Sequence, residues 1–226
     1  MAVNEENYKE VLEKTNAAHA TLVAVSKTKP VSDIQALYEL GQRDFGENYV
    51  QELVEKEAVL PKDIRWHFIG HLQSNKVKYI APFVHLIHGV DSEKLLFEID
   101  KQGAKNNRTI DCLLQVHIAQ EETKFGFDEN ELKLFLETFP KYQALEKLKN
   151  VWIKGLMAMA SFTDDMEKLK QEFAVMKALF QQQAKPETSN LKLETLSMGM
   201  SSDYELALEY GSTMIRVGSL LFGARI

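Results

Sequence analysis

The sequence predicts an α/β fold, a single (β/α)8 barrel of the TIM type with an N-terminal helix. Eight short apolar segments alternate with helical patterns along the 226 residues, as the strands and helices of such a barrel do. No linker, low-complexity run or change of composition divides the chain. An open doubly wound sheet would usually carry a glycine-rich loop after its first strand, whereas this chain continues into Ser26-Lys-Thr-Lys-Pro30. We therefore expect residues 1–226 to form one barrel domain.

The elements follow from the spacing of apolar residues and from turn and cap residues. An amphipathic pattern predicts an opening helix over residues 5–17. The predicted strands are 21–27, 44–47, 65–70, 86–90, 110–117, 152–157, 193–197 and 214–217. The predicted helices are 32–41, 49–59, 74–82, 92–104, 129–139, 164–184 and 202–210. The expected N-caps are Ser32, Ser74, Ser92 and Asp128, and the expected C-caps are Gly41 and Gly211.

Composition excludes several classes of function. The net charge is -6 and the basic residues are scattered, which argues against a nucleic-acid partner. No apolar stretch approaches the roughly 18 residues that a membrane span needs, and the N-terminus lacks the pattern of a signal peptide. Cys112 is the only cysteine, and its apolar surroundings predict a buried, inert thiol. We expect a cytoplasmic protein with no membrane partner and no metal site.

A barrel places its functional residues at the carboxyl ends of its strands. Lys27 ends the first predicted strand, and Asn48 follows the second. The segment from Ser197 to Ser201 follows the seventh strand, and Gly218-Ser219 follows the eighth. The distinctive polar and glycine residues are therefore expected at one rim.

Lys27 is the candidate nucleophile. Burial at a strand end and the neighbouring cation Lys29 would both lower the pKa of its amine, as an aldehyde-capturing lysine requires. A lysine that extends its ammonium out of the strand end into water explains the segment alone equally well.

The turns after the last two predicted strands are candidates for anion binding. Backbone amides and hydroxyls between Ser197 and Asp203, and at Gly218 and Ser219, would face the same rim as Lys27. Ordinary loop and capping chemistry is the alternative for each turn. Together with Lys27 the two turns favour a phosphorylated aldehyde as ligand.

Arg216 lies inside the last predicted strand and needs an acceptor, because an unpaired buried guanidinium is very costly. A carboxylate such as Glu194 or Glu47 is one possibility, and a ring nitrogen of the ligand is the other. His67 lies among apolar residues, and we interpret it as a structural histidine rather than a general base.

Five motifs closely resemble the pyridoxal phosphate homeostasis protein family (YggS/PLPBP type), whose fold is similar to the barrel domain of alanine racemases. They occur in the family's order and span nearly the whole chain: Ala24-Val-Ser-Lys-Thr-Lys-Pro30, Phe45-Gly-Glu-Asn-Tyr-Val-Gln-Glu52, His67-Phe-Ile-Gly-His-Leu-Gln-Ser-Asn-Lys76, Leu196-Ser-Met-Gly-Met-Ser-Ser-Asp203 and Ile215-Arg-Val-Gly-Ser219. The resemblance implies pyridoxal 5'-phosphate (PLP) as cofactor, bound as a Schiff base on Lys27. It also implies that Arg216 faces the pyridine nitrogen. The phosphate is then held by the segment from Ser197 to Ser201, which includes Met200, and by Gly218 and Ser219.

Three functions compete on this basis. The first is a non-catalytic PLP carrier that limits or supplies free PLP and serves PLP-dependent apo-enzymes, which we expect to be a monomer. The second is a PLP-dependent amino-acid racemase or decarboxylase, which would need the closing β-domain for which the chain to Ile226 leaves no room. The third is a Schiff-base aldolase using Lys154, which has no accompanying carboxylate in its motif. We favour the carrier, with no catalytic residue assigned.

Overall fold

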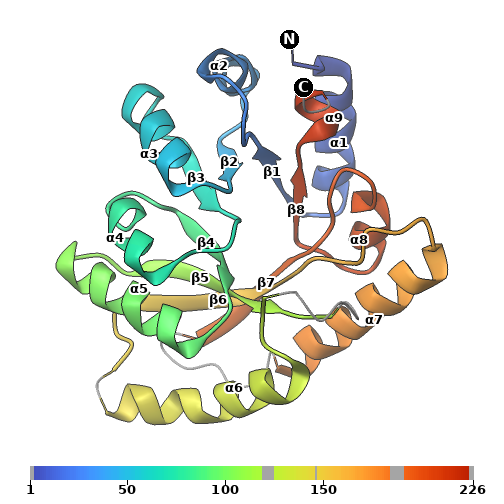
Figure 1. The fold of residues 1–226 in the computed structure, drawn as a ribbon. Helices are drawn as coiled ribbons and strands as arrows, with labels where there is room; N and C mark the ends of the chain where they lie inside the picture. Colours follow the sequence, from blue (N-terminus) through green and yellow to red (C-terminus); the bar gives the residue numbers. More distant parts are fainter. Residues whose placement is uncertain (1–2, 119–124, 146, 184–190, 224–226) are drawn as a thin grey trace.

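A computed structural model describes residues 3–118, 125–145, 147–183 and 191–223. Parallel strands close into a barrel in sequential order, and β8 returns to pair with β1 (Figure 1). This confirms the predicted (β/α)8 architecture. The strands are β1 (Thr21–Val25), β2 (Asp44–Glu47), β3 (Arg65–Phe68), β4 (Leu86–Val90), β5 (Ile110–Val116), β6 (Val151–Ala158), β7 (Leu191–Ser197) and β8 (Met214–Val217).

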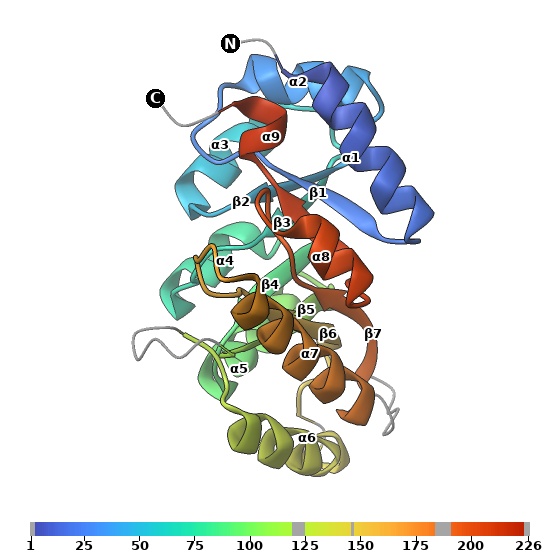
Figure 2. The same cartoon turned by 90° about the vertical axis from the view of Figure 1, so that its right-hand side faces the viewer.

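Helices surround the barrel and connect its strands (Figures 1 and 2). They are α1 (Glu5–Ala17), α2 (Val31–Glu39), α3 (Val50–Val59), the 3-10 turn η1 (Ser74–Lys76), α4 (Val77–Ile80), α5 (Glu93–Lys105), α6 (Glu129–Ala144), α7 (Met166–Gln183), α8 (Tyr204–Glu209) and α9 (Ser219–Phe222). The first helix lies beside the last one, because the Asn4 amide donates to the Leu221 carbonyl at 2.9 Å. The bounds of α1 match the predicted opening helix over residues 5–17, which is confirmed.

The predicted caps are only partly correct. Ser92 Oγ accepts from the Leu95 amide, and Asp128 Oδ1 accepts from the Glu131 amide at 2.8 Å, so both residues cap helices as predicted. Ser32 and Ser74 do not, because α2 and η1 begin after Pro30 and Gln73.

Some element bounds also differ from the prediction. The first strand ends at Val25, because the chain turns at once and the Lys29 amide donates to the Ser26 carbonyl. The four-residue helix α9 was not predicted, because a single turn is too short to show a helical period. The predicted end of the helix at Ala184 lies outside the described residues.

Strand residues alternate between two environments. Outward residues such as Phe45, Cys112 and Ile215 pack under the helices in the main core. A separate inner cluster fills the barrel with one residue each from five strands: Val23, Leu86, Leu113, Met157 and Met214. The same two-residue alternation places a set of polar side chains inside the barrel: Asp44, His67, His88, Ser197 and Arg216.

Cys112 is fully buried in the outer layer, and burial raises the pKa of its thiol well above the ordinary value. The predicted buried thiol is confirmed. Over the described ranges, none of the helices has the length and apolarity to cross a membrane.

Candidate functional site

A cavity of about 470 Å³ opens at the carboxyl ends of the strands. It brings together most of the residues that the sequence predicted for the rim: Lys27, Asn48, Met200, Ser201, Arg216, Gly218 and Ser219. The remaining predicted residue, Ser197, is fully buried beneath Arg216. The wall is completed by side chains that the sequence did not mark, chiefly Ile69, Met159, Phe162 and Leu220.

The backbone on both sides of Lys27 is fixed by α3. On one side, Lys56 Nζ donates to the Ser26 carbonyl at 2.8 Å. On the other, the Thr28 amide donates to Glu52 Oε1 at 2.6 Å. Thr28 has a φ of 63°, a left-handed conformation that a β-branched residue rarely adopts without support. The direction of Lys27 thus depends on contacts made by its two neighbours.

The group behind this segment is a buried ion pair. Lys56 Nζ lies 2.8 Å from Glu47 Oε1 and 2.7 Å from Glu52 Oε1. The Glu47 side chain is fully buried and the Lys56 side chain almost so. Ser26 Oγ donates to the same Glu47 oxygen. Burial raises the pKa of Glu47, and the neighbouring Lys56 ammonium opposes that rise. The sequence analysis missed Lys56, although its spacing of three from the buried Leu53 puts both on one helical face.

Arg216 points from β8 into the barrel and lines the cavity floor. Its Nη1 donates to Ser197 Oγ at 2.6 Å and its Nη2 to the Ala158 carbonyl at 2.9 Å. Burial lowers the pKa of this guanidinium to about 10, so it stays charged at neutral pH. The two carboxylates that the sequence suggested do not accept from Arg216. Glu47 pairs with Lys56, and Glu194 pairs with Lys192 on the surface.

Below Arg216 a line of polar side chains crosses the barrel interior. Ser197 Oγ lies 3.3 Å from His88 Nδ1, and His88 Nε2 lies 2.9 Å from His67 Nδ1. His67 Nε2 lies 3.0 Å from Asp44 Oδ1. Both ring nitrogens of His67 therefore have partners inside the barrel, as expected for a structural histidine.

Asp44, His67 and His85 are close enough together to suggest metal ligands, with donor atoms within 4.8 Å of one another. Arg65 occupies the carboxylate, however, donating from Nε to one oxygen of Asp44 and from Nη2 to the other. A cation would have to displace that guanidinium. We assign no metal to this trio.

The turns after β7 and β8 are held against each other. Gly199 has a φ of 97°, and a Cβ there would stand 2.6 Å from Ala207 Cβ, so glycine is required. Its carbonyl accepts from the Arg216 amide at 3.0 Å. Ser201 Oγ accepts from the Gly218 amide at 3.1 Å, which joins the two turns at the cavity edge.

Two polar groups differ in what they can offer a ligand. The Met200 amide already donates to Asp203 Oδ1 at 2.5 Å, so the turn contributes its hydroxyls rather than this amide. Asn48 Oδ1 is buried and accepts no hydrogen bond. Since a buried polar atom is costly to leave unpaired, this oxygen marks a contact that a ligand can complete.

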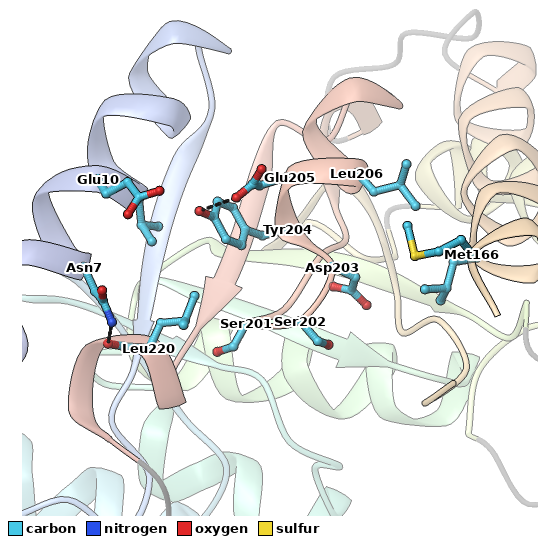
Figure 3. A pocket seen from close by; sticks show the side chains of 12 residues that line it. Asn7, Glu10, Met166, Ser201, Ser202, Asp203, Tyr204, Glu205, Leu206 and Leu220 are labelled. Atoms are coloured by element: carbon cyan, nitrogen blue, oxygen red, sulfur yellow. Dashed lines mark hydrogen bonds between the residues drawn. The ribbon is translucent and has the colours of Figure 1, made fainter. Parts of the chain in front are cut away.

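A second hollow of about 390 Å³ shares Ser201, Ser202 and Leu220 with this cavity and is otherwise lined chiefly by residues of α1, α7 and α8 (Figure 3). Its wall carries the carboxylates of Glu10, Asp203 and Glu205, of which Glu10 and Glu205 share the single ammonium of Lys14, so the carboxylates remain in excess. Negative charge disfavours an anion there. An anionic ligand is therefore expected in the cavity that contains Lys27 and Arg216.

Comparison with known proteins identifies the family. The family model described as alanine racemase, N-terminal domain, matches residues 3–226. The pyridoxal phosphate homeostasis protein of Pasteurella multocida is 41% identical over 209 residues, which cover 90% of this chain and 86% of that protein. The protein of the same name from Aquifex aeolicus is 42% identical over 207 residues, covering 91% and 87%.

Solved structures agree with this. PipY of Synechococcus elongatus without PLP superposes with a TM-score of 0.87 at 35% identity, covering 96% of this chain and 99% of that one. PipY with PLP bound gives a TM-score of 0.78 at 36% identity, covering 91% and 93%. Alanine racemase of Bartonella henselae shares the fold alone, with a TM-score of 0.75 at 17% identity over 99% of this chain and 60% of the racemase. The chain belongs to the pyridoxal phosphate homeostasis protein family, built on the alanine racemase N-terminal domain.

Proposed function

We propose that this protein binds PLP reversibly on Lys27 and acts as a PLP carrier in the homeostasis of the cofactor. One observation carries the proposal: Lys27, the buried Arg216 and the two turns at Ser201 and Gly218 all line one cavity. PipY, a relative with 36% identity, has been solved with PLP bound.

The residues of the cavity match the three chemical parts of PLP. The Lys27 amine would hold the aldehyde covalently, with water as the leaving group. The hydroxyls of Ser201 and Ser219 and the first amides of α9 fit a phosphate at the rim. Arg216 fits the ring nitrogen as a donor, because a guanidinium has no acceptor. Asn48 lines the same wall, and its buried Oδ1 would accept a hydrogen bond from the ligand.

The titratable groups of the wall support a carrier rather than a catalyst. When bound, PLP can act as an electron sink for substrate carbanions, but turnover also needs acids and bases to move protons. In the described part of the wall the titratable side chains are Lys27, Lys29 and Arg216. Lys29 Nζ donates to the carbonyls of Phe222 and Gly223, so it helps to anchor α9.

The mouth of the cavity is also open. Two side chains of its wall are exposed to solvent, Phe162 to 92% and Met159 to 36%, so we expect water to reach a bound ligand. We extend the proposal to release of PLP to PLP-dependent apo-enzymes by a cytoplasmic monomer made of one barrel domain. An aldolase on Lys154 has less support, because its ammonium lies 3.4 Å over the Trp152 ring rather than in the cavity.

Absorbance spectroscopy and hydrogen exchange test this proposal. PLP added to the purified protein should give a visible band that borohydride removes. In deuterated buffer with a panel of L-amino acids, the loaded protein should exchange the α-hydrogen far more slowly than an enzyme. Exchange or racemisation at about 1 to 10³ per second would show a true enzyme and contradict the carrier.

A further inference from the structure

The polar line inside the barrel connects the cavity to the opposite end of the strands. It runs from Arg216 through Ser197, His88 and His67 to Asp44, with contacts of 2.6, 3.3, 2.9 and 3.0 Å. All of these side chains are buried, with Ser197 and His88 at 0% exposure. Each comes from a different strand, and none lies in a loop.

The two ends of the line dictate where its hydrogens lie. Asp44 is a carboxylate that the Arg65 guanidinium binds at both oxygens, and His67 Nε2 lies 3.0 Å from its Oδ1. It can therefore only accept, so His67 Nε2 must carry a hydrogen. At the other end a guanidinium can only donate, so Ser197 Oγ accepts from Arg216.

The two histidines between these ends then have one consistent arrangement. Burial lowers the pKa of His88 well below the ordinary value, so this ring is neutral. With His67 also neutral, its Nδ1 accepts from His88 Nε2, and His88 Nδ1 accepts from the Ser197 hydroxyl. Every donor and acceptor in the line is then used.

The opposite arrangement leaves a buried group unsatisfied. A doubly protonated His67 would donate to His88 Nε2, and His88 Nδ1 would then donate to Ser197. The hydroxyl hydrogen of Ser197 would lose its acceptor, because among the described residues it contacts only Arg216 and His88. A buried donor without an acceptor is destabilising, so the first arrangement is favoured.

We propose that Asp44, His67, His88 and Ser197 form one proton-ordered chain in which every hydrogen points away from the cavity, and that this chain holds Arg216 as a fixed donor at the cofactor ring. The four residues are positioning residues, and Ser197 acts through Arg216 rather than as a ligand of the phosphate. The hydrogen order concerns the protein alone. Its effect on the ring rests on the PLP-binding function proposed above.

The hydrogen order is measured on the ligand-free protein. Nitrogen-15 NMR of labelled histidine distinguishes Nδ1-H, Nε2-H and doubly protonated rings, with His67 and His88 assigned from the variants His67→Gln and His88→Asn. Near neutral pH both rings should be neutral with the hydrogen on Nε2. A hydrogen on Nδ1 of either ring, or a doubly protonated His67, would overturn the proposal.

The effect on the site is measured with Ser197→Ala and a matched control. Ser212 is also buried, and among the described residues its hydroxyl contacts only the backbone carbonyls of Leu196, Met198 and Met214. Ser197→Ala removes the acceptor of a charged donor, so PLP affinity should fall on the order of ten-fold, and the absorbance maximum of bound PLP should move. Ser212→Ala should change neither, and Ser197→Thr should restore both.

The outcomes separate this inference from the proposed function. If Ser197→Ala binds PLP with wild-type affinity and spectrum while Lys27→Ala does not, the chain has no role at the ring and the carrier proposal stands. If the wild-type protein fails to bind PLP, the carrier proposal and the role at the ring fall together. The NMR result then still decides the hydrogen order by itself. Should Ser197→Ala fail to fold, Ser197→Cys takes its place, because a thiol is only a weak acceptor, and the wild-type NMR spectrum still decides the hydrogen order.

Discussion

The ammonium of Lys56 lies 2.8 Å from the carbonyl oxygen of Ser26, the residue directly before Lys27. The contact joins α3 to the segment that presents the proposed PLP-binding amine. The same ammonium neutralises the fully buried Glu47. One side chain therefore connects a buried ion pair with the orientation of Lys27.

Lys56→Met should destabilise the fold strongly. Removing one partner of a buried pair leaves the other charge uncompensated, which costs about 3–5 kcal/mol. Urea unfolding measures the loss, and PLP affinity should fall as well because Ser26 and Thr28 lose their support. Lys62→Met is the matched control, since the Lys62 side chain is 64% exposed in its pair with Glu57 and should cost at most about 1 kcal/mol. Equal effects of the two variants would refute the buried pair.

Gly199→Ala should disturb the site more than Gly41→Ala does. Both glycines have φ near 100°, but a Cβ at Gly41 meets no atom within 4 Å, whereas one at Gly199 meets Ala207. Gly41→Ala should therefore cost about 1–2 kcal/mol from backbone strain alone and keep PLP affinity. Gly199→Ala should cost more and weaken PLP binding, because the turn to Ser201 must shift. Thermal unfolding and PLP titration of both variants provide the comparison.

Asp44 makes stability depend on pH in the acid range. Its pKa is about 2 in the folded protein and 3.8 in the reference state, so the unfolded chain takes up the proton first as pH falls. The stabilisation is complete above the reference pKa and disappears as pH falls towards 2. It amounts to about 2 kcal/mol at neutral pH. Asp44→Asn should flatten the stability curve between about pH 4 and 2, as measured by urea unfolding at each pH. An unchanged curve would show that Asp44 is not held as a carboxylate.

Pyridoxal without its phosphate should bind much more weakly than PLP. The rim offers hydroxyls and amides that favour an anion, and each lost charge-assisted hydrogen bond costs about 1.5–3 kcal/mol. The loss of several such bonds lowers the affinity by several powers of ten. Titration followed by absorbance compares the two aldehydes, and equal affinities would show that the turns at Ser201 and Gly218 do not hold a phosphate.

The sequence was sufficient for the parts of the site that depend on local pattern. Eight apolar segments with intervening helices predicted the barrel, and the position of Lys27 after the first strand placed it at the rim. Arg216 stood out because a guanidinium inside an apolar strand needs a buried acceptor.

Other parts depend on which strands and helices meet. His67 and His88 come into contact only because β3 and β4 pair with His67 opposite Leu86, and no single segment shows this. Ser197 resembled a phosphate ligand in sequence, yet its inward position at the end of β7 puts it behind Arg216. Lys56 was not singled out, since its contact with Glu47 depends on how α3 packs against β2.

Reductive labelling is the most direct test of the central claim that Lys27 carries PLP. The protein is incubated with PLP, reduced with borohydride and digested, and the peptides are mapped by mass spectrometry. The pyridoxyl group should be found on Lys27, and Lys27→Ala should lose both the label and the visible band while remaining folded. Lys29→Ala is the control and should keep the label. A label found chiefly on Lys29 or Lys154, or retained by Lys27→Ala, would contradict the account.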